Sequence, residues 1–134
     1  MIPFHPLADL FPLIEGAEFD DLVDDIRVHG VRDPIVLHGG AILDGRNRYR
    51  ALVELSRTGE LRGPGWGGYA GEPVTDEDLT PEGGLPWFER YSPMLAGEPL
   101  DFVVSRNLKR RHLDESQRAM VAARLANMPA HRPA

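Results

Sequence analysis

The stretch LDGRNRYRA, residues 43–51, contains the change of periodicity that decides the fold. It begins as the end of an apolar run and then, after a glycine, places Tyr49, Leu52 and Val53 on one face of a predicted helix that ends at Gly59. A strand, a glycine turn and a helix N-terminus in this order bring backbone N–H groups to one corner of a protein. The stretch therefore predicts a corner that suits phosphate.

The side chains of this corner are strongly basic, with Arg46, Arg48 and Arg50 following Gly45 within five residues. Glycine lets the backbone approach an anion without a Cβ in the way, and a guanidinium can hold two phosphate oxygens through its planar fork. A solvated helix face with surface ion pairs has the same spacing. The residues alone do not decide between these two interpretations.

The segments before the corner carry clear signals of their own. From Ala17 to His29 apolar residues recur at helical spacing, and Gly30 is the predicted C-terminal cap. Residues 34–38 predict a strand, Gly39-Gly40 a two-residue hairpin turn, and residues 41–43 the returning strand. We expect a helix, a hairpin and a second helix in direct succession.

The segments after the corner are less regular. Between residues 59 and 99 periodicity disappears and Gly and Pro dominate, so we predict an elaborated loop. Five aromatic residues in it indicate that part of the loop packs against the core: Trp66, Tyr69, Trp87, Phe88 and Tyr91. Residues 101–105, DFVVS, predict another strand, and Asp114 with Gln117 predicts the capped start of a last helix that ends before Pro129.

Composition excludes several classes of protein. The 134 residues contain no cysteine, which excludes disulfides, thiolate zinc sites and thiol nucleophiles, and the five histidines fall in no metal-ligand spacing, so we predict no metal site. There is no apolar run long enough to cross a bilayer and no signal-peptide pattern, so we expect a cytoplasmic protein without a membrane partner. A net charge of −6 argues against uniform coating of nucleic acid.

Three of these segments together resemble the N-terminal (ParB-like nuclease) domain of ParB-type DNA partition proteins, in the ParB/sulfiredoxin superfamily. Residues 45–51, GRNRYRA, are similar to the family's GERRxRA box, with matches at Gly45, Arg48, Arg50 and Ala51. Upstream, residues 29–36 resemble the helix-ending glycine and QPI-type strand of the family, with matches at Gly30, Pro34 and Ile35. Downstream, residues 106–113 resemble its ENxQRxxL motif, with matches at Asn107, Arg110 and Leu113.

The resemblance implies an α+β fold, a small mixed sheet flanked by helices, in a domain of residues 1–113 with a Gly/Pro-rich insertion at 59–100. A C-terminal helix and tail would follow at 114–134. It also implies a nucleotide pocket, typically for CTP with magnesium, in a module that closes as a homodimer around DNA during partition or regulation, with possible NTPase activity. The implied nucleotide-binding residues are Gly30, Pro34, Gly45, Arg46, Asn47, Arg48, Arg50, Arg106, Asn107, Lys109 and Arg110.

Three departures from the family pattern bear on the ligand. Arg106 stands where the family has its metal-binding Glu, Arg46 replaces another Glu, and Lys109 stands where Gln is usual. These differences count against magnesium and leave the choice of nucleotide, CTP or another, open. The Arg106 guanidinium could replace the charge of the metal at a phosphate. The basic turn 106–111 could instead contact DNA phosphates.

An enzyme is the alternative. Residues 42–49, ILDGRNRY, also resemble the LDGHHRY segment of free serine kinases, which share the fold, and this implies a small-molecule phosphotransferase with Asp44 as the catalytic acid. Glu15 or Glu18 would then be the second acid, although both also suit a helix N-terminus. A nuclease on the same fold is a further alternative, and so is a degenerate pocket that acts only through protein contacts. Sulfiredoxin activity is excluded because it requires a cysteine.

Overall fold

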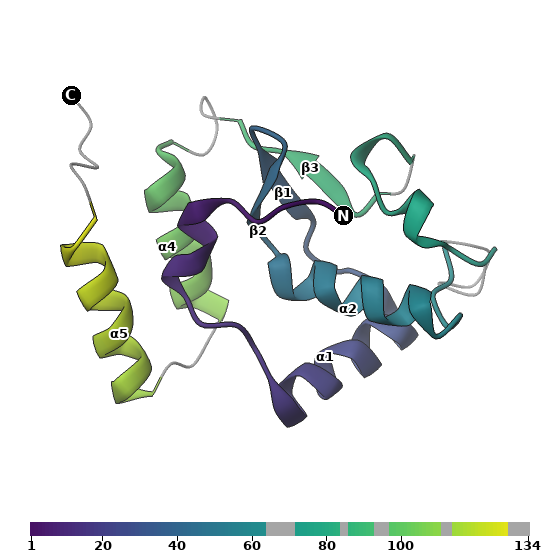
Figure 1. Ribbon diagram of the computed structural model, residues 1–134, viewed down its shortest axis with the longest axis horizontal. Helices are drawn as coiled ribbons and strands as arrows, with labels where there is room; N and C mark the ends of the chain where they lie inside the picture. The colour runs from purple at the N-terminus through teal and green to yellow at the C-terminus, as the bar shows by residue number, and fades with distance from the viewer. Residues whose placement is uncertain (64–71, 84–85, 93–96, 111–113, 129–134) are drawn as a thin grey trace.

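The computed structural model describes residues 1–63, 72–83, 86–92, 97–110 and 114–128, with the side chains of 108–110 left out. Its elements, in chain order, are η1 (Pro6–Leu10), α1 (Gly16–His29), β1 (Ile35–His38), β2 (Ala41–Asp44), α2 (Arg46–Arg57), η2 (Asp76–Asp78), η3 (Pro81–Gly83), β3 (Phe88–Arg90), α4 (Pro99–Arg110) and α5 (Glu115–Ala126). Figure 1 shows α1 and α2 side by side below the sheet, with α4 and α5 to one side. The predicted α+β class is confirmed.

The sheet has three strands in the order β2-β1-β3 and is mixed, as predicted. β1 and β2 form an antiparallel hairpin in which His38 pairs with Ala41, and both turn residues, Gly39 and Gly40, have positive φ, as hairpin turns that follow the strand twist require. β3 joins the other edge of β1 in parallel, with Ile35 opposite Phe88. The predicted hairpin is therefore confirmed.

Alternation along the hairpin divides the core into two clusters. Ile35, Leu37 and Ile42 face α1 and α2 and pack with buried residues such as Leu52 and Trp87. The intervening residues, among them Leu43, face the other way and pack with η1 and α4. The central strand β1 is buried, and β2 also contributes to both clusters, with Ile42 in one and Leu43 in the other.

The helices that flank the hairpin begin and end where the residues predict. Gly30 caps α1 with a φ of 73°, and its N–H donates to the carbonyl of Ile26 at 2.8 Å. α2 begins directly after Gly45, and α5 begins with a reciprocal capping box between Asp114 and Gln117. All three predicted helices are confirmed.

The predicted strand at 101–105 is wrong, because these residues lie within α4. Pro99 occupies the first helical position, where its missing N–H costs nothing, and Asp101 lies in the first turn, where a negative charge is favourable. Phe102 and Val103 are buried while Ser105 is exposed, which is one side of a helix turned to the core. A short apolar run does not distinguish a strand from a buried helix.

The Gly/Pro-rich segment, predicted as a loop, contains the strand β3, which pairs with β1. Trp87, with 1% of its surface exposed, and Tyr91 are buried, so the prediction that part of this segment packs against the core is confirmed. The other two aromatic residues that bear on it, Trp66 and Tyr69, lie outside the described residues.

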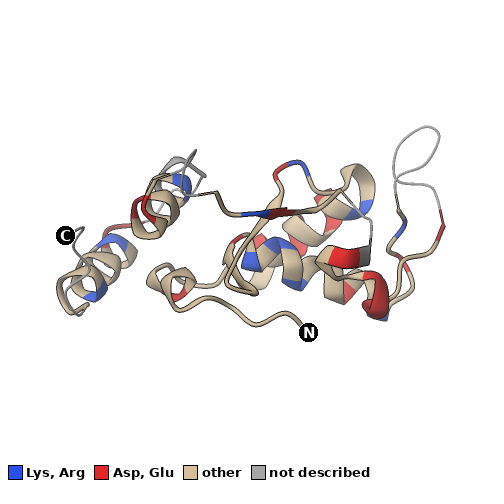
Figure 2. Ribbon diagram, turned by 90° about the horizontal axis from the view of Figure 1, so that it is seen from above, with Lys and Arg blue, Asp and Glu red and all other residues tan. Residues whose placement is uncertain are grey.

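The two ends of the molecule differ in charge and in structure. Figure 2 shows acidic residues gathered at the end that contains η2, whose sequence is DED. At the opposite end α5 rests on η1, and Arg124 donates to the main-chain carbonyl of Asp9 at 2.6 Å. Among the described helices, none combines the length and apolarity needed to cross a membrane.

Candidate functional site

A cavity of about 320 Å³ lies where β2 passes into α2, a volume at the lower end of the range for small-molecule sites. Its apolar wall consists of Ala8, Ile14, Leu22, Ile26, Val31 and Leu43. Its charged residues are Asp25, Arg32, Asp33, Asp44, Arg46 and Arg48. Two glycines and two amides complete the lining: Gly30, Gly45, Asn47 and Asn107. The lining is thus partly apolar and partly charged.

The turn into α2 forms one edge of the cavity. Gly45 is the N-cap and adopts a left-handed conformation, with φ 98° and ψ 19°, which other residues rarely adopt. Glycine provides no side-chain cap, and the N–H groups in the first turn of a helix have no carbonyl of the helix to bond. This edge therefore presents the positive end of the α2 dipole to the cavity.

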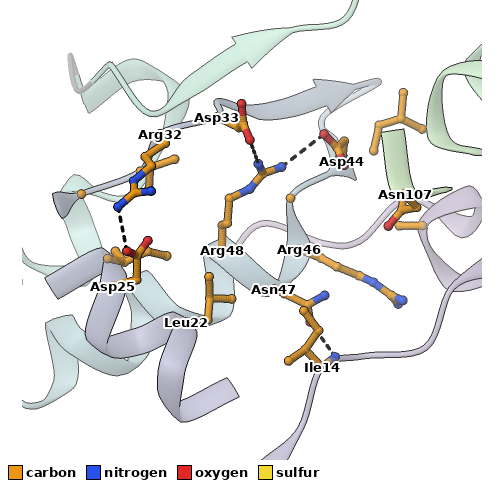
Figure 3. Close-up of a pocket in the computed structure, with 16 residues that line it drawn as sticks. Ile14, Leu22, Asp25, Arg32, Asp33, Asp44, Arg46, Asn47, Arg48 and Asn107 are labelled. Carbon is orange, nitrogen blue, oxygen red and sulfur yellow. Dashed lines mark hydrogen bonds and ion pairs between the residues drawn. The ribbon is translucent and has the colours of Figure 1, made fainter. Parts of the chain in front are cut away.

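Arg48 is the arginine of the corner that lies in the cavity together with two carboxylates. Its Nη2 lies 3.2 Å from Oδ2 of Asp44 and its Nη1 lies 3.7 Å from Oδ2 of Asp33, and Figure 3 shows the guanidinium between them. The Arg48 side chain is 13% exposed, and Asp44 is buried at the end of β2. The pair of Arg48 and Asp44 is thus largely shielded from solvent, where the attraction between opposite charges is stronger than in water.

Arg46 and Arg50 are engaged on other sides of α2. Arg46 is buried, donates to the carbonyl of Phe11 and pairs with Asp9 at 3.1 Å, so its guanidinium anchors η1 although the residue lines the cavity. Arg50 donates to the carbonyl of Ile14 at 2.9 Å and does not line the cavity. The structure therefore does not bring the three arginines together around one anion.

Other contacts of residues 45–51 fix the segment that leads into α1. Asn47 lines the cavity, and its Oδ1 accepts from the N–H of Ile14 at 3.2 Å and from Nη1 of Arg50 at 3.0 Å. The guanidinium of Arg50 also lies over the ring of Phe19, 4.4 Å from its centre. Asn47 and Arg50 together hold the lead-in to α1 against the start of α2.

The loop between α1 and β1 supplies residues that sequence reasoning missed. Gly30, predicted as part of the site, lines the cavity, whereas Pro34 does not. Arg32 and Asp33, which lie between them, do line it, and Arg32 donates to Asp25 at 3.0 Å. The signal that could have found these residues was their position inside the box that contains Gly30 and Pro34.

The downstream segment, residues 106–113, contributes Asn107 to the cavity. Nδ2 of Asn107 donates to the carbonyl of Val103 at 2.9 Å within α4. Arg106 is turned away, with its guanidinium 4.8 Å above the ring centre of Phe102, and it does not line the cavity. The side chains of Lys109 and Arg110 lie outside the described residues. Of the two predicted site residues in this segment whose side chains the structure describes, Asn107 lines the cavity and Arg106 does not.

Among the described residues that line the cavity, three are aspartates and three are arginines. Asp25 pairs with Arg32, and both Asp33 and Asp44 pair with Arg48. Among the described residues no group of three or more His, Asp or Glu is placed to hold a metal ion. Glu15 and Glu18, the predicted second acids of a kinase, are exposed and do not line the cavity.

Comparison with known proteins found no matching family model, no matching curated protein and no matching solved structure.

Proposed function

We propose that this chain is a ParB-like nucleotide-binding module of the ParB/sulfiredoxin fold, which binds a nucleoside triphosphate such as CTP in the cavity at the start of α2. By the same resemblance, its role is in DNA partition or DNA-binding regulation, with DNA and a second copy of the chain as partners. The proposal rests on the site more than on the fold, since a fold hosts many functions.

One observation carries the proposal. Gly30, Gly45, Asn47, Arg48 and Asn107 come from three segments that resemble the three nucleotide-binding boxes of the family, and they line one cavity. The first two segments are neighbours in the chain, on either side of the β1–β2 hairpin, whereas Asn107 lies about 60 residues further on, in α4. Local structure alone does not explain why the third segment reaches the same cavity as the other two.

The charged and the apolar lining residues of the cavity suit the two parts of a nucleotide. The N-terminus of α2 and the Arg48 guanidinium favour phosphate, through main-chain N–H groups and a bidentate fork. The apolar wall, which includes Leu22 and Val31, suits a base and sugar. In this arrangement Gly45 lets phosphate approach the backbone, Asp44 orients Arg48, and Asn107 offers its Oδ1 to the nucleoside side.

Calorimetric titration with CTP, ATP, GTP and UTP, each with and without magnesium, tests the proposal. We expect at least one nucleotide to bind and to stabilise the fold, by about 2.7 kcal/mol at 100 times its dissociation constant. Arg48→Ala should lose about tenfold or more in affinity, because a charge-assisted hydrogen bond is removed. Arg48→Lys keeps the positive charge but not the planar fork, so its nucleotide affinity should lie between those of the unmodified protein and Arg48→Ala.

Arg57→Ala is the matched control, since Arg57 lies exposed in the last turn of the same helix and does not line the cavity. It should bind as the unmodified protein does. Unfolding midpoints of all variants separate a binding defect from a folding defect. Absence of binding by every nucleotide to the folded, unmodified protein would refute the proposal.

A second candidate is a phosphotransferase, favoured by the position of Asp44, which is 5% exposed and lines the same cavity as the proposed phosphate ligands. A carboxylate there could orient or deprotonate a small hydroxyl compound. Asp44→Asn distinguishes the two roles. If Asp44 is catalytic, the substitution lowers kcat by orders of magnitude at saturating nucleotide. If Asp44 only positions Arg48, the substitution raises KM and leaves kcat unchanged.

A further inference from the structure

We propose that Asp33 is an internal competitor for the phosphate-binding guanidinium of Arg48, and that this competition sets how tightly the site binds its ligand. The inference rests on the proposed nucleotide function, because it concerns the same cavity. It assigns a role to a residue that lies outside the matches to the family boxes.

Two carboxylates share the guanidinium of Arg48. Asp44 contacts Nη2 of Arg48 and Asp33 contacts Nη1, so each end of the fork faces a different acid. A phosphate that binds Arg48 through two oxygens needs one of these positions. One carboxylate must therefore give way or share its donor.

Burial decides which carboxylate gives way. Asp44 is 5% exposed and lies 3.2 Å from Arg48, so separating this pair would leave a charge without solvent. The Asp33 side chain is 56% exposed and its contact is longer, at 3.7 Å, so water can take over its solvation. Phosphate is thus expected to replace Asp33 and leave the Asp44 contact intact.

The charge of Asp33 adds to this competition. Asp33 lines the cavity, so its carboxylate stays near any anion that binds Arg48 there. Like charges placed together at a binding site oppose association. Asp33 therefore weakens binding both by occupying Arg48 and by repelling the ligand, and its removal is expected to tighten binding.

The test measures dissociation constants of Asp33→Asn for CTP, ATP and inorganic tripolyphosphate. The substitution keeps the size of the side chain and removes its charge. We expect binding to tighten about two- to fivefold, which is the range for loss of one exposed ion pair. Tripolyphosphate should gain as much as the nucleotides, because the effect concerns phosphate and not the base. Asp33→Ser, with a smaller neutral side chain, should tighten binding in the same direction.

Asp24→Asn is the matched control for net charge. Asp24 is an exposed acid of α1 that pairs with Arg27 at 2.7 Å and does not line the cavity. Tightening in both Asp33 variants but not in Asp24→Asn supports the inference, and equal affinities for Asp33→Asn and Asp24→Asn overturn it. If the unmodified protein binds none of the three probes, the proposed function itself fails and the inference falls with it.

Discussion

Gly45 and Arg48 fit together so closely that a Cβ on Gly45 would lie 2.7 Å from Nη2 of Arg48. The guanidinium folds back over the start of its own helix, and the atom that would be struck is the one that contacts Asp44. Glycine at this position therefore serves two purposes. It permits the left-handed backbone, and it leaves the space in which Arg48 reaches its carboxylate.

Gly45→Ala is expected to destabilise the protein and to weaken ligand binding. The positive φ alone costs about 1–2 kcal/mol for alanine. The new methyl group also displaces the Arg48 guanidinium from Asp44, because the far end of a side chain moves more readily than the backbone. We expect about a tenfold loss of nucleotide affinity, measured by calorimetry on the folded variant.

Gly40→Ala is the control for this substitution. Gly40 also has a positive φ, 79°, but a Cβ there would meet nothing within 4 Å. Gly45→Ala should lose more free energy of unfolding than Gly40→Ala in chemical denaturation, because only Gly45→Ala also disturbs the buried pair of Arg48 and Asp44, and only Gly45→Ala should lose affinity. Undiminished binding by Gly45→Ala would show that the fit between Gly45 and Arg48 is unimportant for the ligand.

Arg46→Ala is expected to lower the free energy of unfolding more than it lowers nucleotide affinity. The Arg46 side chain is buried, and its removal leaves the carbonyl of Phe11, a residue 1% exposed, without this donor. An unsatisfied buried acceptor costs about 1–3 kcal/mol. Asp9→Asn should cost less than about 1 kcal/mol, since Asp9 is 70% exposed. Equal losses in urea denaturation would contradict this ranking.

Stability is expected to fall on mild acidification because of His5. Burial, with a smaller contribution from the nearby His38, lowers the pKa of His5 below its ordinary value of 6.5. The unfolded chain therefore takes up a proton at a higher pH than the folded protein does. The resulting stabilisation is fully present above pH 6.5 and is lost as the pH falls from there toward the lowered pKa.

His5→Asn separates this effect from other titrations. Nδ1 of His5 accepts from the N–H of Leu7 at 3.1 Å and caps η1, and asparagine can provide the same kind of cap without titrating. Urea unfolding between pH 7 and pH 5 should therefore show a flatter dependence in this variant. The same slope in both proteins would assign the pH dependence to other groups.

Local signals were enough to predict most of the secondary structure. The Gly39-Gly40 turn, the Gly30 cap and the Asp114–Gln117 capping box each act within a few residues, so the printed sequence contains all the information they need. The short helices η1, η2 and η3 were not predicted, and neither were β3 and α4. β3 depends on parallel pairing with β1, more than 50 residues away, and α4 depends on the buried environment of Phe102 and Val103.

The roles of the arginines were not predictable either. On a helix, positions two apart point in very different directions, so the sequence placed three basic side chains at the corner without saying where each one goes. Arg46 and Arg50 are drawn aside by the carbonyls of Phe11 and Ile14, which belong to the segment between η1 and α1. Only the packing of that segment against α2 leaves Arg48 to the cavity.

The sequence by itself determined the hairpin, the helices that flank it and the glycine turn before α2, because these depend on backbone conformations that neighbouring residues prefer. The tertiary structure decided that Gly30, Gly45, Arg48 and Asn107 line one cavity and that Asp33 shares Arg48 with Asp44. Except for the contact between Asp44 and Arg48, which are four residues apart, these arrangements join residues that are well separated in the chain, and burial and charge in the folded protein select them.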